Sequence, residues 1–490
     1  MSSQAPVSEV TAPRDGRQNG TPRSEIDRLF RLQRANRQPL RMTSAEQRRE
    51  KLRALRDMVL SHRKQIQDAL FADFRKPPSE TDVSETAAVA TEAAHAAKHV
   101  KEWMAPKRVS TPAQLAGTAS EIRYEPKGQS LVIAPWNFPV NLSLSPIVAA
   151  LAAGCSVILK PSEHTPFTSR LLREMLHATF DEREVAVVEG AVETSQYLLA
   201  KPFDHIFFTG STHVGKIVMR AAAEHLSSVT LELGGKSPVI VDETADVKKA
   251  AKRIALGKFI NCGQTCIAPD HVYVHRSRHD DLVEALDATI ASFYGGTPED
   301  RMQSMDYARV VNPSHHERLQ GLLDDALARG AQVAAGSGDA GDGNYLDPTV
   351  LTNVPEDAAI MQEEIFGPLL PILRYDDLRE VVSAINDRPK PLALYVFSRS
   401  DTSVEYVLNH TSAGGSTINN VFLHNLNPEL PFGGVNASGI GSYHGYYGFR
   451  EFSHERAIVR QRRLPSPLDM VSPPYTGFTR RAVDAALKLV

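Results

Sequence analysis

The chain has 490 residues, of which 42% are apolar and 23% charged, with a formal net charge of −3. This length and composition indicate a globular protein of two or three domains. The nearly balanced charge excludes nucleic-acid binding by overall electrostatics. Three cysteines in so long a chain argue against a disulfide framework and favour a reducing compartment, so we expect a cytoplasmic protein. No uncharged stretch approaches the ~20 apolar residues that a membrane span requires.

The N-terminal region divides into a polar segment and a helical one. Residues 1–20 lack an apolar core, so we expect them to be disordered and not a secretory signal. From Ser24 to Arg75, and through the Ala-rich 85–104, apolar residues three or four apart predict helices. The dense arginines of the first stretch are typical of solvated helix faces, with an anionic-surface patch as the alternative.

From about residue 127 onward, short apolar runs alternate with segments of helical spacing. Four runs end in Gly, Pro, Asn or Ser: "SLVIAPWNFPV", "CSVILKPSE", "DHIFFTGSTHVG" and "SVTLELGGKSPVIV". Strands that alternate with helices predict an α/β fold with a doubly wound parallel sheet, whose ligands bind beyond the carboxyl ends of the strands. The polar residues at these ends are therefore the candidate functional residues.

Asn137, held between two prolines in "PWNFP", follows the first of these runs. A rigid amide there is placed to donate to an oxyanion, and an ordinary Asx turn is the alternative. In the third run, Gly210 and Gly215 match the outer glycines of a GxGxxG dinucleotide motif, although Thr212 replaces the middle one. That pattern alone would make Glu232, 22 positions after Gly210, the ribose carboxylate.

Two carboxylates compete for the role of ribose ligand. Lys160 and Glu163, in "LKPSE", are the alternative ribose readers at the end of the neighbouring strand. Glu232 would then be free for chemistry, because a carboxylate inside an apolar run has a raised pKa that suits a general base. A buried ion pair between Glu232 and Lys236 is a further alternative.

The stretch "FINCGQTCIAPD", residues 259–270, holds two of the three cysteines. No second close cysteine pair and no HExxH accompanies them, and the 17 histidines show no ligand-spaced cluster, so we predict no metal site. A disulfide between Cys262 and Cys266, four residues apart, would be strained. A glycine-led loop running into a helix would aim N–H groups at Cys266 and favour its thiolate. Cys266 is thus the candidate nucleophile, with core packing as the alternative, and Cys262 a packing residue.

The C-terminal half repeats the α/β alternation from about 246 to 425, which predicts a second α/β domain. The proline-rich stretch 464–477 should be extended. The last residues place Val483, Leu487 and Val490 on one helix face, which favours either a docking helix or a weak contact with a membrane surface.

Taken together, these stretches resemble the aldehyde dehydrogenase superfamily. The motifs are "PWNFP", "LKPSE", "FTGST.VG", "LELGGKSP", "GQTC", "EEIFGP" (363–368) and "PFGG" (431–434), which stand in that family's order over about two-thirds of the chain. Within it, "NCGQTCIAPD" and the stretch 431–456 are similar to the class 3 and fatty-aldehyde branch. Relatives in that branch often have a small residue where Cys262 stands.

The resemblance implies NAD-dependent oxidation of an aldehyde to a carboxylic acid, with NADP tolerated, through a thiohemiacetal and a thioester on Cys266. It makes Glu232 the base that activates water and Asn137 the oxyanion donor. The cofactor-binding residues that it implies are Lys160 and Glu163 on the adenosine ribose, Gly210, Ser211 and Gly215 near the pyrophosphate, and Glu364 on the nicotinamide ribose, with Phe366 and Trp136 beside it.

The resemblance also implies substrates, partners and a domain division. The substrates are medium- or long-chain aliphatic, apocarotenoid-like or aromatic aldehydes; the alternatives are a catalytically silent structural relative and an acylating, coenzyme A-dependent enzyme. A small β bridging element implies a homodimer. The expected division is a disordered 1–20, an NAD-binding domain of 21–104 and 127–231, a catalytic domain of 232–425, a bridging element of 105–126 and 426–463, and a tail of 464–490.

Overall fold

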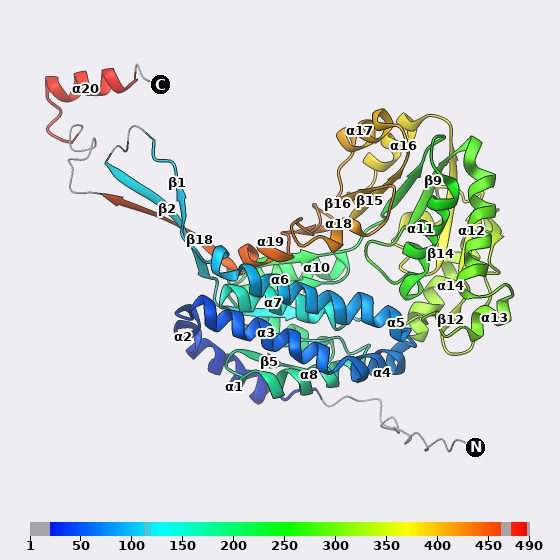
Figure 1. Cartoon of the computed structure of the whole chain (residues 1–490), viewed down its shortest axis with the longest axis horizontal. Coiled ribbons are helices and arrows are strands. Elements are labelled where there is room, and N and C mark those ends of the chain that lie inside the picture. The colour runs from blue at the N-terminus through cyan, green and yellow to red at the C-terminus, as the bar shows by residue number, and fades with distance from the viewer. Residues whose placement is uncertain (1–19, 113–114, 116, 462–471, 488–490) are drawn as a thin grey trace.

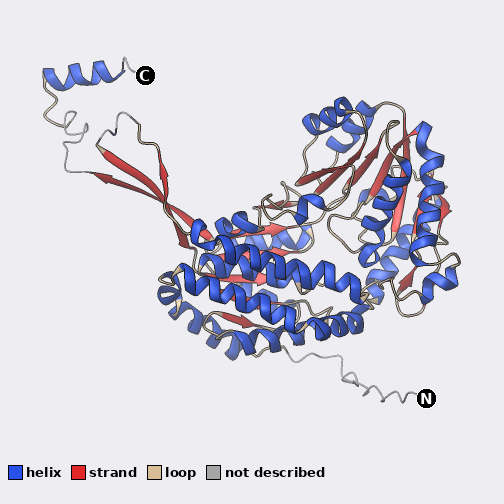
Figure 2. Ribbon diagram, in the orientation of Figure 1, coloured by secondary structure: helices blue, strands red, loops and turns tan. Residues whose placement is uncertain are grey.

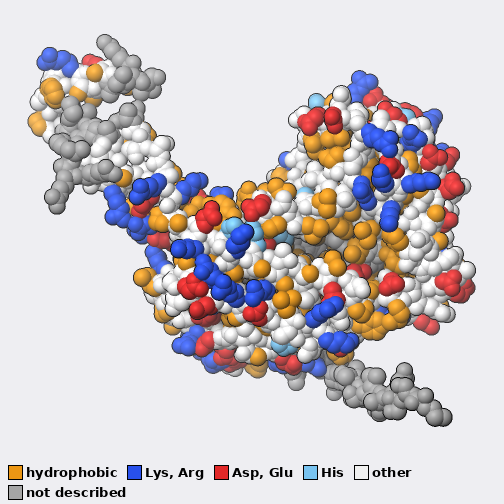
Figure 3. All heavy atoms as spheres, in the orientation of Figure 1, with side chains coloured by type: hydrophobic (Ala, Val, Ile, Leu, Met, Phe, Trp, Pro, Cys, Tyr) orange, Lys and Arg blue, Asp and Glu red, His pale blue; other side chains and the backbone are white. Residues whose placement is uncertain are grey.

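Two mostly parallel sheets and a projecting β-arm organise the molecule (Figures 1 and 2). The computed structural model describes residues 20–112, 115, 117–461 and 472–487. The predicted α/β fold class, with a doubly wound parallel sheet, a second α/β unit and a small β element, is confirmed. On the face shown in Figure 3, basic and acidic side chains are interspersed, as the small net charge predicts.

The first sheet has the strand order β17-β7-β6-β3-β4-β5, in which only β17 is antiparallel. Its central strands are buried at every residue, as parallel strands covered on both faces require. The strands are β3 (Gln129–Ile133), β4 (Ser156–Lys160), β5 (Val185–Val187), β6 (His205–Thr209), β7 (Ser228–Glu232) and β17 (Gly439–Ile440).

Helices cover both faces of this sheet. The crossover helices are α7 (Asn141–Ala153), α8 (Pro166–Thr179), α9 (Val192–Leu199) and α10 (Thr212–Ala223). The N-terminal helices, which the sequence predicts, are α1 (Arg23–Ala35), α2 (Arg37–Arg41), α3 (Ala45–Ser61), α4 (Arg63–Phe74), α5 (Pro78–Thr81), a π-helical turn (Asp82–Thr86) and α6 (Ala87–Trp103). Of these, α3 and α6 pack on each other and on α7.

The second sheet has the order β10-β13-β14-β9-β8-β15-β16. Its strands are β8 (Pro238–Val241), β9 (His271–His275), β10 (Gln332–Ala335), β13 (Thr349–Thr352), β14 (Leu369–Tyr375), β15 (Ala393–Phe397) and β16 (Gly415–Ile418). Its longer helices are α11 (Val247–Phe259), α12 (His279–Tyr294), α14 (Pro313–Ala328), α16 (Leu378–Asn386) and α17 (Asp401–His410). Short elements complete it: α13 (Pro298–Gln303), β11 (Ala340–Gly341), β12 (Tyr345–Leu346), α15 (Ala359–Gln362) and α18 (Leu423–Leu426).

The chain passes between the two sheets inside the stretch that reads as one apolar run, "SVTLELGGKSPVIV". Its first half forms β7 in the first sheet, and its second half forms β8 in the second. Gly234 and Gly235 make the connection, and Gly235 has a φ of 158°. Glu232, the last residue of β7, therefore lies at the junction of the two sheets.

The β-arm is the antiparallel sheet β1-β2-β18, which projects away from both bodies (Figure 1). Its strands are β1 (Lys107–Val109), β2 (Thr118–Pro126) and β18 (Ser453–Gln461). All nine residues of β2 are only partly buried. Of the range 426–463, only β18 joins the arm; β17 pairs with β7, and α19 (Gly445–Glu451) packs against α6 and α7.

The C-terminal helix α20 (Gly477–Leu487) lies beyond the tip of the arm (Figure 1). Phe478 is 62% exposed and Leu487 is 68% exposed, so this helix does not dock on the body of its own chain. The expected disorder of 1–20 lies outside the described residues apart from position 20, as do Val490 and residues 464–471 of the stretch expected to be extended. In the described part of the chain no helix is both long and apolar enough to cross a membrane.

Candidate active site

Three segments that are remote in sequence meet at the junction of the two sheets. They are the loop after β3 with Asn137, the end of β7 with Glu232, and the loop between α11 and β9 with Cys266. The Asn137 side chain donates to the carbonyl of Gln264, two residues before Cys266, at 3.0 Å. The carboxylate of Glu232 is close enough to raise the pKa of the Cys266 thiol. The structure thus brings these three predicted residues together.

The cysteine loop has an unusual backbone. Asn261, Cys262 and Gly263 have φ values of 55°, 55° and 74°, so three consecutive residues are left-handed. A Cβ atom at Gly263 would overlap the carbonyl of Gly367, so only glycine fits there. The helix expected after Cys266 is absent, and that expectation is wrong, because the chain makes a turn and enters β9.

Side-chain amides hold this loop in its strained form. Asn261 donates to the carbonyls of Asn137, at 2.8 Å, and Gln264, at 3.1 Å. Gln264 donates to the carbonyls of Asn261 and Arg309, at 2.9 and 3.0 Å, and accepts from the Val311 amide at 2.9 Å. Such multiple bonds over-determine a left-handed backbone, which otherwise costs roughly 1–2 kcal/mol per non-glycine residue.

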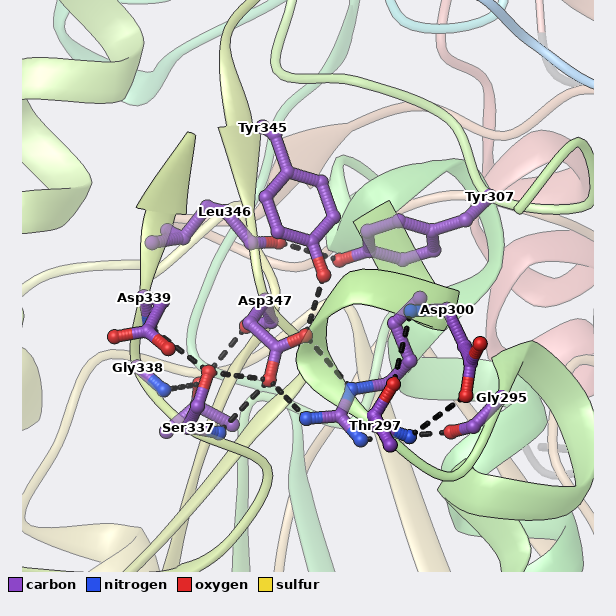
Figure 4. A network of polar contacts seen from close by, with 12 residues as sticks. Gly295, Thr297, Asp300, Tyr307, Ser337, Gly338, Asp339, Tyr345, Leu346 and Asp347 are labelled. Carbon is purple, nitrogen blue, oxygen red and sulfur yellow. Dashed lines mark hydrogen bonds and ion pairs between the residues drawn. The ribbon is translucent and has the colours of Figure 1, made fainter. Parts of the chain in front are cut away.

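Cys262 points into the core and away from the reaction centre. It is fully buried, and its Sγ donates to the Tyr307 hydroxyl at 3.4 Å. That hydroxyl donates to the Leu346 carbonyl at 2.9 Å, beside the buried Arg301–Asp347 ion pair with contacts of 2.8 Å (Figure 4). Burial raises the pKa of Cys262 to about 12. These contacts are those of a packing residue that anchors the loop to the network below it.

Cys266 is partly buried, and its environment opposes ionisation. Burial raises the pKa of its thiol to about 12, with further contributions from the carboxylates of Glu364 and Glu232. The N–H groups of Cys266 and Ile267 act in the opposite direction. The backbone N–H groups thus favour the thiolate, as expected, but burial and the two carboxylates outweigh them.

Glu232 is 3% exposed, and neither of its carboxylate oxygens has a hydrogen-bond partner among the described residues. Burial, and then the charge of Glu451, raise its pKa well above the ordinary value. Glu451 is held beside it by the Thr230 hydroxyl, at 2.9 Å. The alternative of an ion pair with Lys236 is wrong, since that ammonium contacts Asp270 at 2.5 Å.

Asn137 is buried and has one amide N–H beyond the bond to Gln264. That bond reaches 127 residues along the chain, so the contact that the amide makes is a tertiary one and not the local contact of an Asx turn. The loop around it rests on a fully buried ion pair, Lys76–Glu85, at 2.8 Å. Glu85 accepts from the amides of Val140 and Asn141, at 3.1 and 2.8 Å, and the Lys76 ammonium lies 3.9 Å from the Phe138 ring centroid.

The predicted dinucleotide residues lie at the carboxyl ends of β4 and β6. Lys160 and Glu163 form an ion pair at 2.6 Å. At Gly210 a Cβ atom would overlap the Phe208 ring, and Ser211 caps α10, accepting from the Val214 amide at 3.4 Å. A tight turn into a helix N-terminus suits a pyrophosphate. Gly215 serves close packing, since a Cβ there would meet Leu233.

The predicted nicotinamide-side residues come from the second sheet and from the loop after β3. Burial, then Asp270, raise the pKa of Glu364 to about 8, and its Oε1 has no hydrogen-bond partner in the part of the chain that the structure describes. A Cβ at Gly234 would overlap this carboxylate. The rings of Phe366 and Trp136 pack edge to face, with centroids 5.4 Å apart. A buried acceptor without a donor fits a sugar hydroxyl, so these residues fit a dinucleotide.

Some of these residues are not apparent from sequence. Glu451 lies in a stretch that reads as surface, and Lys76 and Glu85 read as ordinary helical charges. The histidines do form one ligand-spaced group, contrary to the expectation: His95 and His99 are four residues apart in "HAAKH" and meet Glu429. Helical i, i+4 spacing is the signal that could have identified them.

Comparisons with known proteins agree with this geometry. The family model described as "Aldehyde dehydrogenase family" matches residues 4–458. The chain is 46% identical over 431 residues to 4,4'-diaponeurosporen-aldehyde dehydrogenase of Staphylococcus aureus, covering 88% of this chain and 92% of that protein. It is 42% identical over 449 residues to aldehyde dehydrogenase family 3 member B1 of Rattus norvegicus, covering 91% and 94%. An NAD+ complex of aldehyde dehydrogenase from Bacillus cereus has a TM-score of 0.82 at 30% identity, covering 90% and 89%.

Neutralising Glu364 should make Cys266 more reactive. In Glu364→Gln, the loss of the carboxylate should lower the pKa of the thiol, so that alkylation by iodoacetamide becomes faster at a fixed alkaline pH. Cys155 and Cys262 are fully buried, so the rate reports on Cys266. The pH dependence of alkylation measures the shift. Glu363→Gln is the matched control, because that exposed neighbour pairs with Arg318; equal rates in the two variants would contradict the assignment.

Proposed function

Because this chain belongs to the aldehyde dehydrogenase family, we propose that it oxidises an aldehyde to a carboxylic acid with NAD as oxidant and Cys266 as nucleophile. The observation that supports this most directly is the junction of the two sheets. There a thiol, a buried carboxylate without a partner and an amide with a spare N–H come together from three segments.

The first half of the reaction uses Cys266 and Asn137. The thiolate of Cys266 attacks the aldehyde carbon, and the carbonyl oxygen becomes an oxyanion. The spare N–H of Asn137 and the backbone N–H of Cys266 stabilise it, and one such donor is typically worth about 3 kcal/mol. NAD, when bound, supplies a nicotinamide ring that takes up the hydride released as the carbon becomes a thioester. Lys160, Glu163, Gly210, Ser211, Glu364, Phe366 and Trp136 are the residues that would hold it.

The second half uses Glu232. Its raised pKa makes it a strong enough base to take a proton from water, which then attacks the thioester and releases the acid and the Cys266 thiolate. The absence of a hydrogen-bond partner within the described residues leaves both carboxylate oxygens available to that water. A base in this position favours hydrolysis over transfer of the acyl group to coenzyme A.

We assign an apolar aldehyde as the substrate class: medium- or long-chain aliphatic, apocarotenoid-like or aromatic. The Staphylococcus aureus relative is named for an apocarotenoid aldehyde. Two buried aromatic rings lie near the thiol in this chain: burial raises the pKa values of Tyr395 and Tyr443, and the charge of Cys266 contributes to both. Such walls favour an apolar substrate.

The cofactor preference follows from Glu163. Burial raises its pKa, but the charge of Lys160 and its hydrogen bond lower it further, so that the carboxylate is ionised at neutral pH. An anion at this position repels the 2′-phosphate of NADP. We therefore infer that NAD is preferred and NADP tolerated.

The chain should assemble as a homodimer through the arm and α10. Val459 on β18 is 57% exposed, and on α10 Val214 and Ile217 are 39% and 42% exposed. A small sheet is stabilised by packing one face against another layer, and the exposed strands of the arm have such a face available, so a second copy should cover it. In such a dimer, α20 with its exposed Phe478 could dock on the second copy. A weak contact of α20 with a membrane surface is the alternative.

Replacing the base should separate the two halves of the reaction. Glu232→Gln should release one rapid burst of NADH per site and then turn over about 10²–10⁴-fold more slowly than wild type, because only hydrolysis needs the base. Stopped-flow absorbance of NADH measures both phases, and Cys266→Ala should show neither. Equal loss of burst and steady state would refute the base role, and acceleration by coenzyme A would favour the acylating reaction.

Changing Glu163 should relax the cofactor preference. In Glu163→Ser the repulsion of the 2′-phosphate is removed, so the ratio of kcat/KM for NADP to that for NAD should rise at least tenfold, which corresponds to about 1.4 kcal/mol. Glu174→Ser, on the exposed face of α8, is the control and should leave the ratio unchanged. A wild-type preference for NADP would contradict the assignment.

A charge on α10 should dissociate the dimer. Wild-type protein should sediment at twice the chain mass of 53.8 kDa, and Ile217→Asp should shift the mass toward one chain, because burying an unpaired carboxylate is costly. Leu256→Asp, a site 47% exposed on α11, is the matched control and should remain dimeric. A wild-type protein of single-chain mass would overturn the proposal.

A further inference from the structure

Outside the active site, one face of α6 gathers polar side chains toward the segment 427–445. Glu92, His95 and His99 follow each other at helical spacing on this face, and Trp103 continues it. Glu92 accepts from the Gly445 amide at 2.7 Å, which fixes the segment against the helix. The Nε2 atom of His95 lies 3.5 Å from a carboxylate oxygen of Glu429, in the turn that precedes "PFGG".

We propose that His95, His99 and Glu429 form a binding site for a divalent transition-metal ion of the zinc type. One ligand atom from each residue lies within 4.8 Å of the others. Ligands about 2.0–2.1 Å from a tetrahedral ion are about 3.3 Å apart, so the ligand atoms need to approach one another by up to about 1.5 Å. Two imidazoles and a carboxylate leave a fourth position for water.

The surroundings prepare the two imidazoles for an ion. The ring centroids of His95 and His99 are 4.6 Å apart, and both rings lie near the Trp103 indole, at 5.7 and 6.1 Å. The Nδ1 of His99 lies 3.6 Å from a carboxylate oxygen of Glu102, so a small movement would let Glu102 orient this ring with its Nε2 toward an ion.

The carboxylate is the most exposed of the three ligands. Glu429 has a 70% exposed side chain, whereas that of His95 is 14% exposed. The turn that carries Glu429 is ordered by Asn427, whose side-chain oxygen accepts from the Glu429 amide at 3.0 Å. The carboxylate can therefore swing onto an ion while the histidines stay in place. The ion would tie α6 to the segment that also carries Phe432 and Tyr443, so it would act as a clamp on one wall of the active site.

Cobalt binding tests the site directly. Full-length Cys266→Ser protein, free of any histidine tag, is titrated with Co²⁺, so that the active-site thiol cannot bind it. We expect one ion per chain, a d–d spectrum without thiolate charge transfer, and quenching of Trp103, one of only two tryptophans. Competition by Zn²⁺ should reverse these signals.

Variants assign the ligands. His95→Asn and His99→Asn should each weaken binding by more than the about 10–100-fold typical of losing an outer-shell partner. In the Cys266→Ser parent, the bound ion should slow amide hydrogen exchange in residues 427–445. Glu429→Gln should weaken Co²⁺ binding as well and abolish this slowing. His177→Asn, which removes an exposed histidine on α8, is the matched control. No saturable binding, or binding that these three changes leave intact, would overturn the proposal.

Discussion

The structure depends on one electrostatic constraint: three ionisable groups, Cys266, Glu232 and Glu364, share a buried crevice in which nearby cations do not offset the cost of burial. Burial is the largest cause of the raised pKa of each group, and the carboxylates raise the pKa of the thiol further. The nearby ammonium of Lys236 is already committed to Asp270. The crevice therefore favours a neutral resting state, and each group becomes charged only at a cost.

Such a crevice requires a rigid frame, because unpaired polar groups would otherwise draw in water or collapse. The frame consists of buried polar networks that lie under the loops and do not touch the reacting atoms. The Lys76–Glu85 pair holds the Asn137 loop, and Gln264 holds the cysteine loop from within. The Tyr307 network does the same from below Cys262 (Figure 4). Buried polar networks whose hydrogen bonds are all made specify one conformation. These networks therefore keep the reacting side chains in a fixed arrangement.

The sequence predicts the strands and the residues at their ends well, because parallel strands are continuous apolar runs and ligand residues follow them. It does not predict the acidity of Cys266, since Glu364 comes from almost 100 residues further along the chain and no local pattern couples the two. The sequence also does not show that the run "SVTLELGGKSPVIV" is divided into β7 of one sheet and β8 of the other. Both halves are apolar, and only Gly234 and Gly235 mark the point where the chain passes between the sheets. The left-handed Cys262 also breaks local preference, as expected where tertiary contacts override it.

The short strand β17 gives the C-terminal region a role beyond assembly. Gly439 is the register partner of Glu232, and the same segment continues through α19 into β18 of the arm. A mechanical load on the arm would thus reach, after one short helix, the edge strand β17 that pairs with the strand carrying Glu232. A chain cut between β17 and β18 would keep its nucleotide sheet but lose this linkage between the arm and the strand next to Glu232.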